Sequence, residues 1–513
     1  MNSSEKFSNK IVIVIIGTAW IVHLAMIWIY RFVPATDYPE WLYQANILAH
    51  YSDPAYQFSR WYELILVPVP NGGFILPLAI LATLLPIEFA GKLFLSLYVL
   101  VFPLAVRYYF RSIDNKSSHW LISILLLFNI SFLNGNFAFL FGFCLFLFTI
   151  GFLERTKAHS SQLPHIIIIL LVIALFFAHA VCAFVFLIYL VVCIVEKRFK
   201  FSNIKYIIIS LFLLISLGLM YYLLRPQEHL VNQFAWGFNL RYRVSVLTKS
   251  FVGGIVFPPY EFSPYQTLGN VLLFFFVASI GVYSLKELKK WFRSSVAKLT
   301  LIIMLLAVCS PKYVFGVGEP SQRFAIICFI LLAGFLKTQG QGKKILLSMI
   351  IILSIIVSTV RVQGYASASS TLQRRYEFLR EYLPSYPNVL TLNDGLGTSK
   401  IPFYHLIPKG INFIFQTNYH LMGGGYNPLL FRTAYLMPRY DILSRISNLM
   451  NERNEKGFLA LHGIDIPDEI NYIVLDSSTD WSTQMIKQLK PEFSVIAEKE
   501  IANGMKTTLL QRN

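Results

Sequence analysis

Long apolar runs separated by short polar segments dominate the first 360 residues of the chain. A helix that crosses a bilayer needs about 20 mostly apolar residues. Runs of this kind recur at 11–29, 91–110, 120–132, 137–152, 163–178, 181–195, 206–224, 268–285, 299–309, 324–336 and 345–360. A shorter run at 73–86 is broken by Pro77. The pattern predicts an α-helical polytopic membrane protein with about 11–13 transmembrane helices.

The pattern changes near residue 360, where mixed helical and alternating periodicities replace the long apolar runs. Expected strands lie at 388–392, 472–476, 493–497 and 507–511, and expected helices at 371–383, 438–454 and 482–490. Helices interleaved with short strands are typical of an α/β domain. The chain is therefore predicted to consist of a membrane module over 1–364 and a small α/β domain over 365–513.

Charge is scarce and unevenly placed. Only 14% of the residues are charged, against about a quarter in soluble domains. Residues 1–360 hold 28 Lys and Arg against 13 Asp and Glu, whereas residues 361–513 hold 16 against 14. The excess cations lie between apolar runs rather than on a folded polar face, so they indicate membrane topology and not a nucleic-acid partner. The five cysteines all fall inside apolar runs, which predicts neither a disulfide framework nor a CxxC metal site.

The positions of the cations also predict an orientation. Basic clusters occur near 6–10, 107–116, 155–157, 197–205, 286–298 and 337–344. Loops rich in Lys and Arg face the cytoplasm. The N-terminus is then cytoplasmic, the protein lies in the cytoplasmic (inner) membrane, and the α/β domain is extracytoplasmic. The external segments are 31–72, 134–136, 178–180, 225–267, 311–322 and the chain after 361. Residues 73–86 either dip in and return or lie at the interface, unless 61–72 adds a further crossing.

Asp37 is the first candidate for chemistry, because it directly follows the first apolar run. A carboxylate near the membrane surface, backed by aromatic residues, can act as a general base towards an acceptor hydroxyl. The alternative is an ordinary helix cap, because a short helix is expected through 41–50, with Pro39 near its start.

Several other polar residues lie at the external ends of apolar runs. Arg323 opens a late helix and can bind a lipid phosphate as a planar cation, or serve as an interfacial anchor. Lys312 is a similar, weaker candidate. His179 separates two apolar runs and is either a turn residue or a ligand-binding group. Asn134 and Asn136 are best explained as turn residues.

The order of these features resembles the GT-C superfamily of polytopic glycosyltransferases. The run from Asp37 to Ala45, DYPEWLYQA, is similar to an Asp-x-Pro-x-His/Trp-x-x-x-Ala pattern of bacterial members. The start of an apolar run at 136–143, the turn at 178–180 and the loop at 311–323 that leads into a late helix also fit this family, as does an external C-terminal domain. The resemblance covers most of the chain through short motifs.

The resemblance implies that the protein transfers a sugar from a polyprenyl-phosphate carrier to an extracytoplasmic glycan, lipid or protein. The implied site has Asp37 and Glu40 for catalysis, Arg323, Lys312 and His179 for the donor phosphate, and Arg241 and Arg243 for the acceptor. Asp37 would be a general base or a ligand of a divalent cation such as Mg²⁺ or Mn²⁺. Many members carry two adjacent acids in this loop, whereas Asp37 and Glu40 are separated, which leaves the need for a metal open.

Two other classes of function compete with this interpretation. A transporter of lipid-linked saccharides would need ionisable residues in the middle of its spans, and the apolar runs hold few. A non-catalytic assembly component of a cell-envelope polysaccharide system would use the external domain to recruit partners. Loss of Asp37 distinguishes the enzyme from the assembly component, which would tolerate it.

Overall fold

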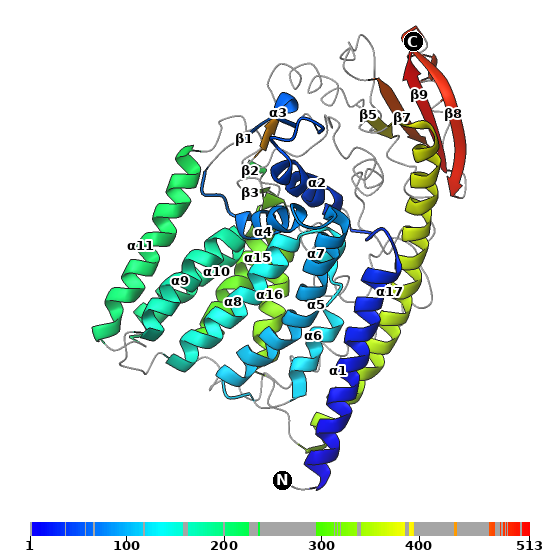
Figure 1. Cartoon of the computed structure of the whole chain (residues 1–513). Coiled ribbons are helices and arrows are strands. Elements are labelled where there is room, and N and C mark those ends of the chain that lie inside the picture. Colours follow the sequence, from blue (N-terminus) through cyan, green and yellow to red (C-terminus); the bar gives the residue numbers. More distant parts are fainter. Residues whose placement is uncertain are drawn as a thin grey trace.

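A bundle of apolar helices and a small C-terminal sheet, connected by one long helix, make up the part of the chain that can be described (Figure 1). The computed structural model describes residues 3–35, 37–56, 58–64, 67–115, 118–156, 163–197, 201–224, 234–235, 294–311, 313–314, 317–318, 320–335, 340–384, 389–393, 436–438, 471–477, 483, 486–487, 489, 491–502 and 505–513. The predicted run at 268–285, and the predicted site residues Lys312, Arg241 and Arg243, lie outside the residues whose side chains are described.

The helices follow the apolar runs closely. Their bounds are α1 Ser3–Ile29, α2 Tyr38–Ala49, α3 Phe58–Trp61, α4 Gly72–Ala82, α5 Ile87–Ser112, α6 Ile122–Leu125, α7 Ile130–Leu133, α8 Phe137–Thr156, α9 Leu163–Ala178, α10 Ala180–Val195, α11 Phe201–Leu224, α15 Ser295–Cys309, α16 Pro320–Gly334 and α17 Gly340–Tyr382, with a 3-10 turn η1 at Ser118–Leu121. The helix expected through 41–50 is confirmed as α2, which has Pro39 in its first turn.

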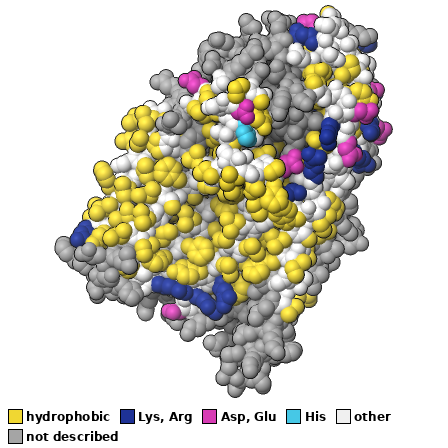
Figure 2. Space-filling model, viewed as in Figure 1, with side chains coloured by type: hydrophobic (Ala, Val, Ile, Leu, Met, Phe, Trp, Pro, Cys, Tyr) yellow, Lys and Arg dark blue, Asp and Glu magenta, His cyan; other side chains and the backbone are white. Residues whose placement is uncertain are grey.

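Three of the described helical segments are long and apolar enough to cross a membrane: Ile87–Ser112, Phe137–Thr156 and Ile204–Leu224. Six further apolar helices are shorter, among them both helices that flank His179. Figure 2 shows the outer face of this bundle as a broad apolar surface, as expected for side chains that meet lipid rather than water. The helices therefore support membrane association.

Contacts at helix ends show how neighbouring helices alternate in direction. Arg31, just after α1, lies 3.2 Å from Glu88 at the start of α5. Arg323 at the start of α16 hydrogen-bonds Asn136 just before α8. The Asp37 amide donates to the carbonyl of Asn134. Residues 30–35, Asp37, 134–136 and 320–323 therefore gather at one end of the bundle, which we call the Asp37 end. Helices α2 and α4 lie across this end (Figure 1).

The opposite end of the bundle carries the described basic loops, and we call it the basic end. Asn115, after α5, donates to the carbonyl of Gly334 at the end of α16, at 2.6 Å. Glu196, after α10, contacts Lys298 in the first turn of α15. A row of Lys and Arg side chains borders the apolar surface on this side in Figure 2. The helices thus place the described external and cytoplasmic segments of the predicted topology at opposite ends.

Residues 120–132 do not form the single helix expected there. The segment is a 3-10 turn, the four-residue helix α6, a turn and the four-residue helix α7. Asn129 explains the break, because its side-chain oxygen accepts from the amides of Ser131 and Phe132 at 2.8 and 3.1 Å. Its amide nitrogen donates to the carbonyl of Leu126 at 2.8 Å. A side chain that bonds the local backbone in this way competes with a continuous helix.

The run at 73–86 becomes α4, a helix of 11 residues. At about 1.5 Å per residue, such a helix is much shorter than the apolar core of a bilayer. It packs against α2, α5, α8 and α9, and Gly73 allows its backbone to lie directly on that of Phe177. The helix is therefore shorter than the three described helical segments that are long and apolar enough to cross a membrane.

The C-terminal sheet has strand order β5-β7-β9-β8. Its strands are β5 Val389–Asn393, β7 Tyr472–Ser477, β8 Phe493–Ala502 and β9 Met505–Arg512. β5 is parallel to β7, and the other two pairings are antiparallel. All four strands expected from the alternating pattern are confirmed. Phe378 and Leu379 of α17 pack on Val474 and Leu509 to form the core beneath the sheet.

Two minor sheets pair segments that are far apart in the chain. β1 Tyr62–Leu64 is antiparallel to β6 Leu436–Pro438. β2 Phe234–Ala235 joins the hairpin of β3 Tyr313–Val314 and β4 Val317–Gly318. The helix expected over 438–454 is described only at Pro438, which ends β6.

Candidate functional site

Asp37 occupies the N-cap position of α2, at the Asp37 end of the bundle. Its backbone angles are φ −94° and ψ 0°, and its carboxylate makes no capping hydrogen bond to α2. The side chain is half-buried. Glu40 lies in the first turn of the same helix and is buried, close to the positive end of the helix dipole. Asp37 therefore lies at the cap position of α2, as the capping alternative predicts, but its side chain does not make the capping hydrogen bond.

The turn at 134–136 holds the backbone of Asp37. The Asp37 amide donates to the carbonyl of Asn134 at 3.1 Å, and the indole of Trp41 donates to the carbonyl of Gly135 at 2.9 Å. Gly135 has φ +77°, and a Cβ at this position would lie 2.6 Å from the Asp37 nitrogen. Glycine is needed here both for the left-handed backbone and for the close approach.

The same turn holds Arg323. The guanidinium of Arg323 donates to Oδ1 of Asn136 at 2.9 Å, and Asn134 donates to the side chain of Gln322 at 3.2 Å. Arg323 is buried and lies over the ring of Phe139, 5.9 Å from its centre. The Asn-Gly-Asn turn thus contacts the predicted base on one side and the predicted phosphate ligand on the other.

His179 fills the one-residue gap between α9 and α10. Its Nδ1 accepts from the Val181 amide at 3.1 Å and so caps α10. Its ring lies edge-on to Phe139, 5.4 Å between centres, and Gly142 leaves room for its Cβ. Burial, and then the nearby charge of Arg323, lower the pKa of His179 well below its usual value. The imidazole is therefore neutral, and with Nδ1 accepting, its hydrogen is on Nε2.

Three of the predicted site residues are thereby brought together from distant parts of the chain. Asp37 and Arg323 share the 134–136 turn, while Arg323 and His179 share Phe139. A buried planar cation next to a neutral imidazole N–H suits an oxyanion, because charge-assisted hydrogen bonds strengthen where water is excluded. A half-buried carboxylate nearby can accept a proton.

From the sequence, only a turn role is expected for Asn134 and Asn136. The structure shows that Asn136 also accepts from Arg323 and that Asn134 donates to Gln322. The Asn-Gly-Asn run at the start of an apolar helix is the sequence feature that could have indicated this second role. Nothing local, however, shows which distant side chains the run contacts. Among the described residues, no group of three or more His, Cys, Asp or Glu side chains gathers as a metal site would. Asp37 remains the carboxylate on which the expectation of a cation depends.

No protein-family model matches the chain, and no curated protein matches it.

Proposed function

We propose that the protein is a polytopic glycosyltransferase of the GT-C type in the cytoplasmic membrane, with its site on the extracytoplasmic side. It would move a sugar from a polyprenyl-phosphate carrier to a glycan, lipid or protein. The observation that carries this proposal is the placement of Asp37 and Arg323 on one turn at the end of an apolar bundle, with His179 against the same Phe139 ring as Arg323. A carrier with an apolar tail and a phosphate at the interface matches that arrangement.

The proposed step is a direct displacement. The acceptor hydroxyl attacks the anomeric carbon while the bond from that carbon to the phosphate oxygen breaks, and the configuration inverts. Asp37 accepts the hydroxyl proton. The departing phosphate keeps the electron pair, and Arg323 together with the Nε2–H of His179 stabilises its growing charge. The neutral state of His179 suits this role, because it donates a hydrogen bond without titrating near neutral pH.

A divalent cation remains part of the proposal only as the resemblance implies it. Asp37 would be its ligand, and its contribution would be to neutralise phosphate charge. The displacement above is assigned to side chains of this chain alone.

Substitution of Asp37 by Asn tests the proposal directly. We expect the rate of transfer from polyprenyl-phosphate sugars to a crude envelope acceptor fraction to fall about 100-fold or more, because the base is lost while the shape is kept. The assay uses the full chain purified into lipid, and it follows consumption of the carrier-linked sugar.

Asp53→Asn is the matched control. Asp53 lies in the same predicted external segment, its side chain is exposed, and its carboxylate accepts from the amide of Ala55. It should leave transfer unchanged. If Asp37→Asn transfers sugar as fast as the wild type, Asp37 is not the base. If folded wild-type protein consumes no carrier, the assembly or transport alternatives replace the enzyme.

A further inference from the structure

Helix α17 contacts the segment that leads to Asp37 along one of its faces. Ser369 donates to the carbonyl of Phe32 at 2.5 Å. The ring of Tyr376 packs on Phe32, 5.5 Å between centres, and its hydroxyl accepts from Arg31 at 3.1 Å. Residues 31 and 32 precede Asp37 by five or six positions, so α17 fixes the start of the segment that carries the proposed base.

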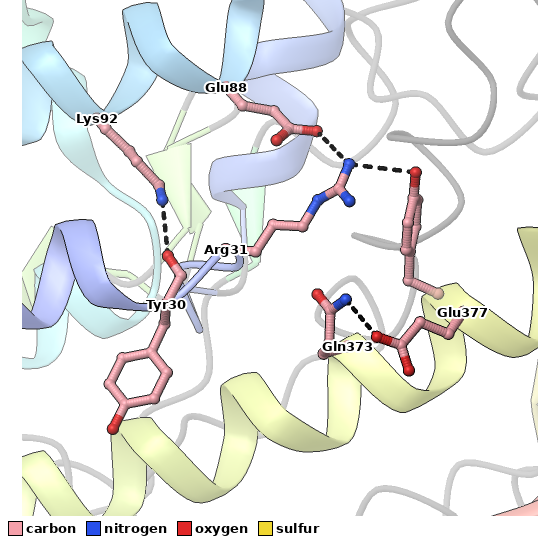
Figure 3. A network of polar contacts seen from close by, with 7 residues as sticks. Tyr30, Arg31, Glu88, Lys92, Gln373 and Glu377 are labelled. Atoms are coloured by element: carbon pink, nitrogen blue, oxygen red, sulfur yellow. Dashed lines mark hydrogen bonds and ion pairs between the residues drawn. The ribbon is translucent and has the colours of Figure 1, made fainter.

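Arg31 lies between two helices at this point. Figure 3 shows its guanidinium between Glu88 of α5 and the hydroxyl group presented by α17. The guanidinium also lies over the Tyr376 ring, 4.1 Å from its centre. Lys92 of α5 donates to the carbonyl of Tyr30 at 2.7 Å, so the two residues before Phe32 are both tied to α5. The segment is thus clamped between α5 and α17.

A neighbouring face of α17 holds the C-terminal sheet. Arg375 makes a two-pronged ion pair with Asp476 of β7, with Nε–Oδ1 at 3.1 Å and Nη2–Oδ2 at 2.7 Å. Thr507 of β9 donates to the same carboxylate at 2.6 Å. Both charged side chains are almost fully buried, at 1% and 0% exposed. Such a pair is directional, because the planar guanidinium bonds both carboxylate oxygens at once. Breaking it is costly, because one buried charge is left without its partner.

These two faces meet at consecutive residues. Arg375 and Tyr376 differ in direction by about 100° around the helix, because an α-helix has 3.6 residues per turn. The exposed residues Arg374, Glu377 and Arg380 follow at intervals of three and form the third, solvent face. A rotation of α17 that moved Arg375 would therefore also move Tyr376.

We propose that α17 couples the C-terminal sheet to the Asp37 segment, with Arg375 and Tyr376 as positioning residues. The ion pair between Arg375 and Asp476 sets the rotation of α17 about its axis. Tyr376 and Ser369 contact residues 31 and 32, so the rotation of α17 determines the position of these two residues. Any ligand or partner that shifts the sheet then shifts Asp37. The coupling itself rests on contacts alone, and its effect on sugar transfer rests on the proposed function.

Hydrogen exchange tests the coupling without any assay of activity. Asp476→Asn keeps the shape of the side chain and removes its charge. We expect exchange of the Asp37 and Trp41 amides, which bond Asn134 and Asp37, to speed up at least about tenfold in the full chain in detergent. Glu498→Gln is the matched control, because Glu498 pairs with Lys506 on the exposed side of the same sheet. It should leave these amides unchanged.

If Asp476→Asn speeds exchange in β7 and β9 but not at Asp37 and Trp41, the coupling is overturned.

Should that variant fail to fold, the triple change Arg375→Met, Asp476→Leu and Thr507→Val removes the directional bonds without leaving a buried charge, and the same two outcomes apply. Tyr376→Phe should speed exchange at Asp37 without changing it in the sheet. If the transfer activity is real, Asp476→Asn should lower kcat more than it raises KM for the carrier. Absence of transfer would refute the enzyme and leave the exchange result standing.

Discussion

Single residues at the Asp37 end acquire their roles from neighbours that are remote in the chain. Asp37 and Arg323 are linked through one turn, and Arg323 is also the charge that helps keep His179 neutral. The types of these residues were visible in the sequence, and so was their position at the ends of apolar runs. The hydrogen bonds between them were not, because no local pattern specifies which side chain Asn136 meets.

The neutral state of His179 predicts a pH dependence of stability. Its pKa is lowered in the folded protein, so the unfolded chain binds the proton more tightly, and the folded state loses stability as the pH falls. The stabilisation is complete above the unfolded pKa of about 6.5 and fades below it. His179→Asn keeps a cap acceptor that does not titrate. We therefore expect the wild-type Tm to fall more steeply than that of the variant between about pH 7 and 5.

Thermal unfolding in detergent, followed by tryptophan fluorescence, measures this difference. His50→Asn is the control, because His50 stacks on Tyr56 outside the proposed site, and it should preserve the wild-type slope. Identical slopes for the wild type and His179→Asn would show that His179 does not carry the predicted linkage.

Elements were predictable where periodicity alone decides them. The four C-terminal strands and helix α2 match their patterns, since alternation and a proline-led start specify them locally. Residues 120–132 were not predictable, because a run of apolar residues does not show that Asn129 turns its side chain onto the backbone. Likewise, the helix expected at 371–383 proved to be the end of the single 43-residue helix α17, because residues 361–370 contain no proline to break it.

Asn129→Leu tests the cause of the break in 120–132. Leucine suits the apolar surroundings but cannot accept from the Ser131 and Phe132 amides, which lie in a buried segment. We expect a loss of about 1–3 kcal/mol in stability, which is the cost of buried donors left without a partner. The measurement is the midpoint of denaturant unfolding in detergent.

Asn129→Ser retains an accepting oxygen, loses the amide donor to Leu126 and buries no charge, so it should lie between the wild type and Asn129→Leu. A leucine variant as stable as the wild type would mean that the break is imposed by the packing of neighbouring helices instead.

At the scale of the whole molecule, alternation of helix direction places the Asp37 segment, the 134–136 turn, His179 and the start of α16 at one end. The described basic loops lie at the other end. The positions of Lys and Arg in the sequence predicted this separation, because loops rich in these residues stay on the cytoplasmic side of a membrane. It did not predict that α17 would join the sheet to the first external segment, since that depends on contacts between residues more than 300 positions apart.

Cysteine labelling in intact cells tests the proposed orientation of this bundle. Four of the five native cysteines are buried, and Cys309 is exposed, so Cys309→Ser supplies the background. Asp53→Cys and Lys506→Cys place thiols on the Asp37 side and on the sheet, whereas Asp114→Cys and Lys197→Cys place them at the basic end. All four positions are exposed or have an exposed side chain.

We expect a membrane-impermeant maleimide to label the first pair in intact cells and the second pair only after permeabilisation, because basic loops face the cytoplasm. The reverse pattern would put the proposed site on the cytoplasmic side, where the carrier would have to present its sugar before crossing. Labelling of all four positions from outside would mean that the bundle does not span the membrane.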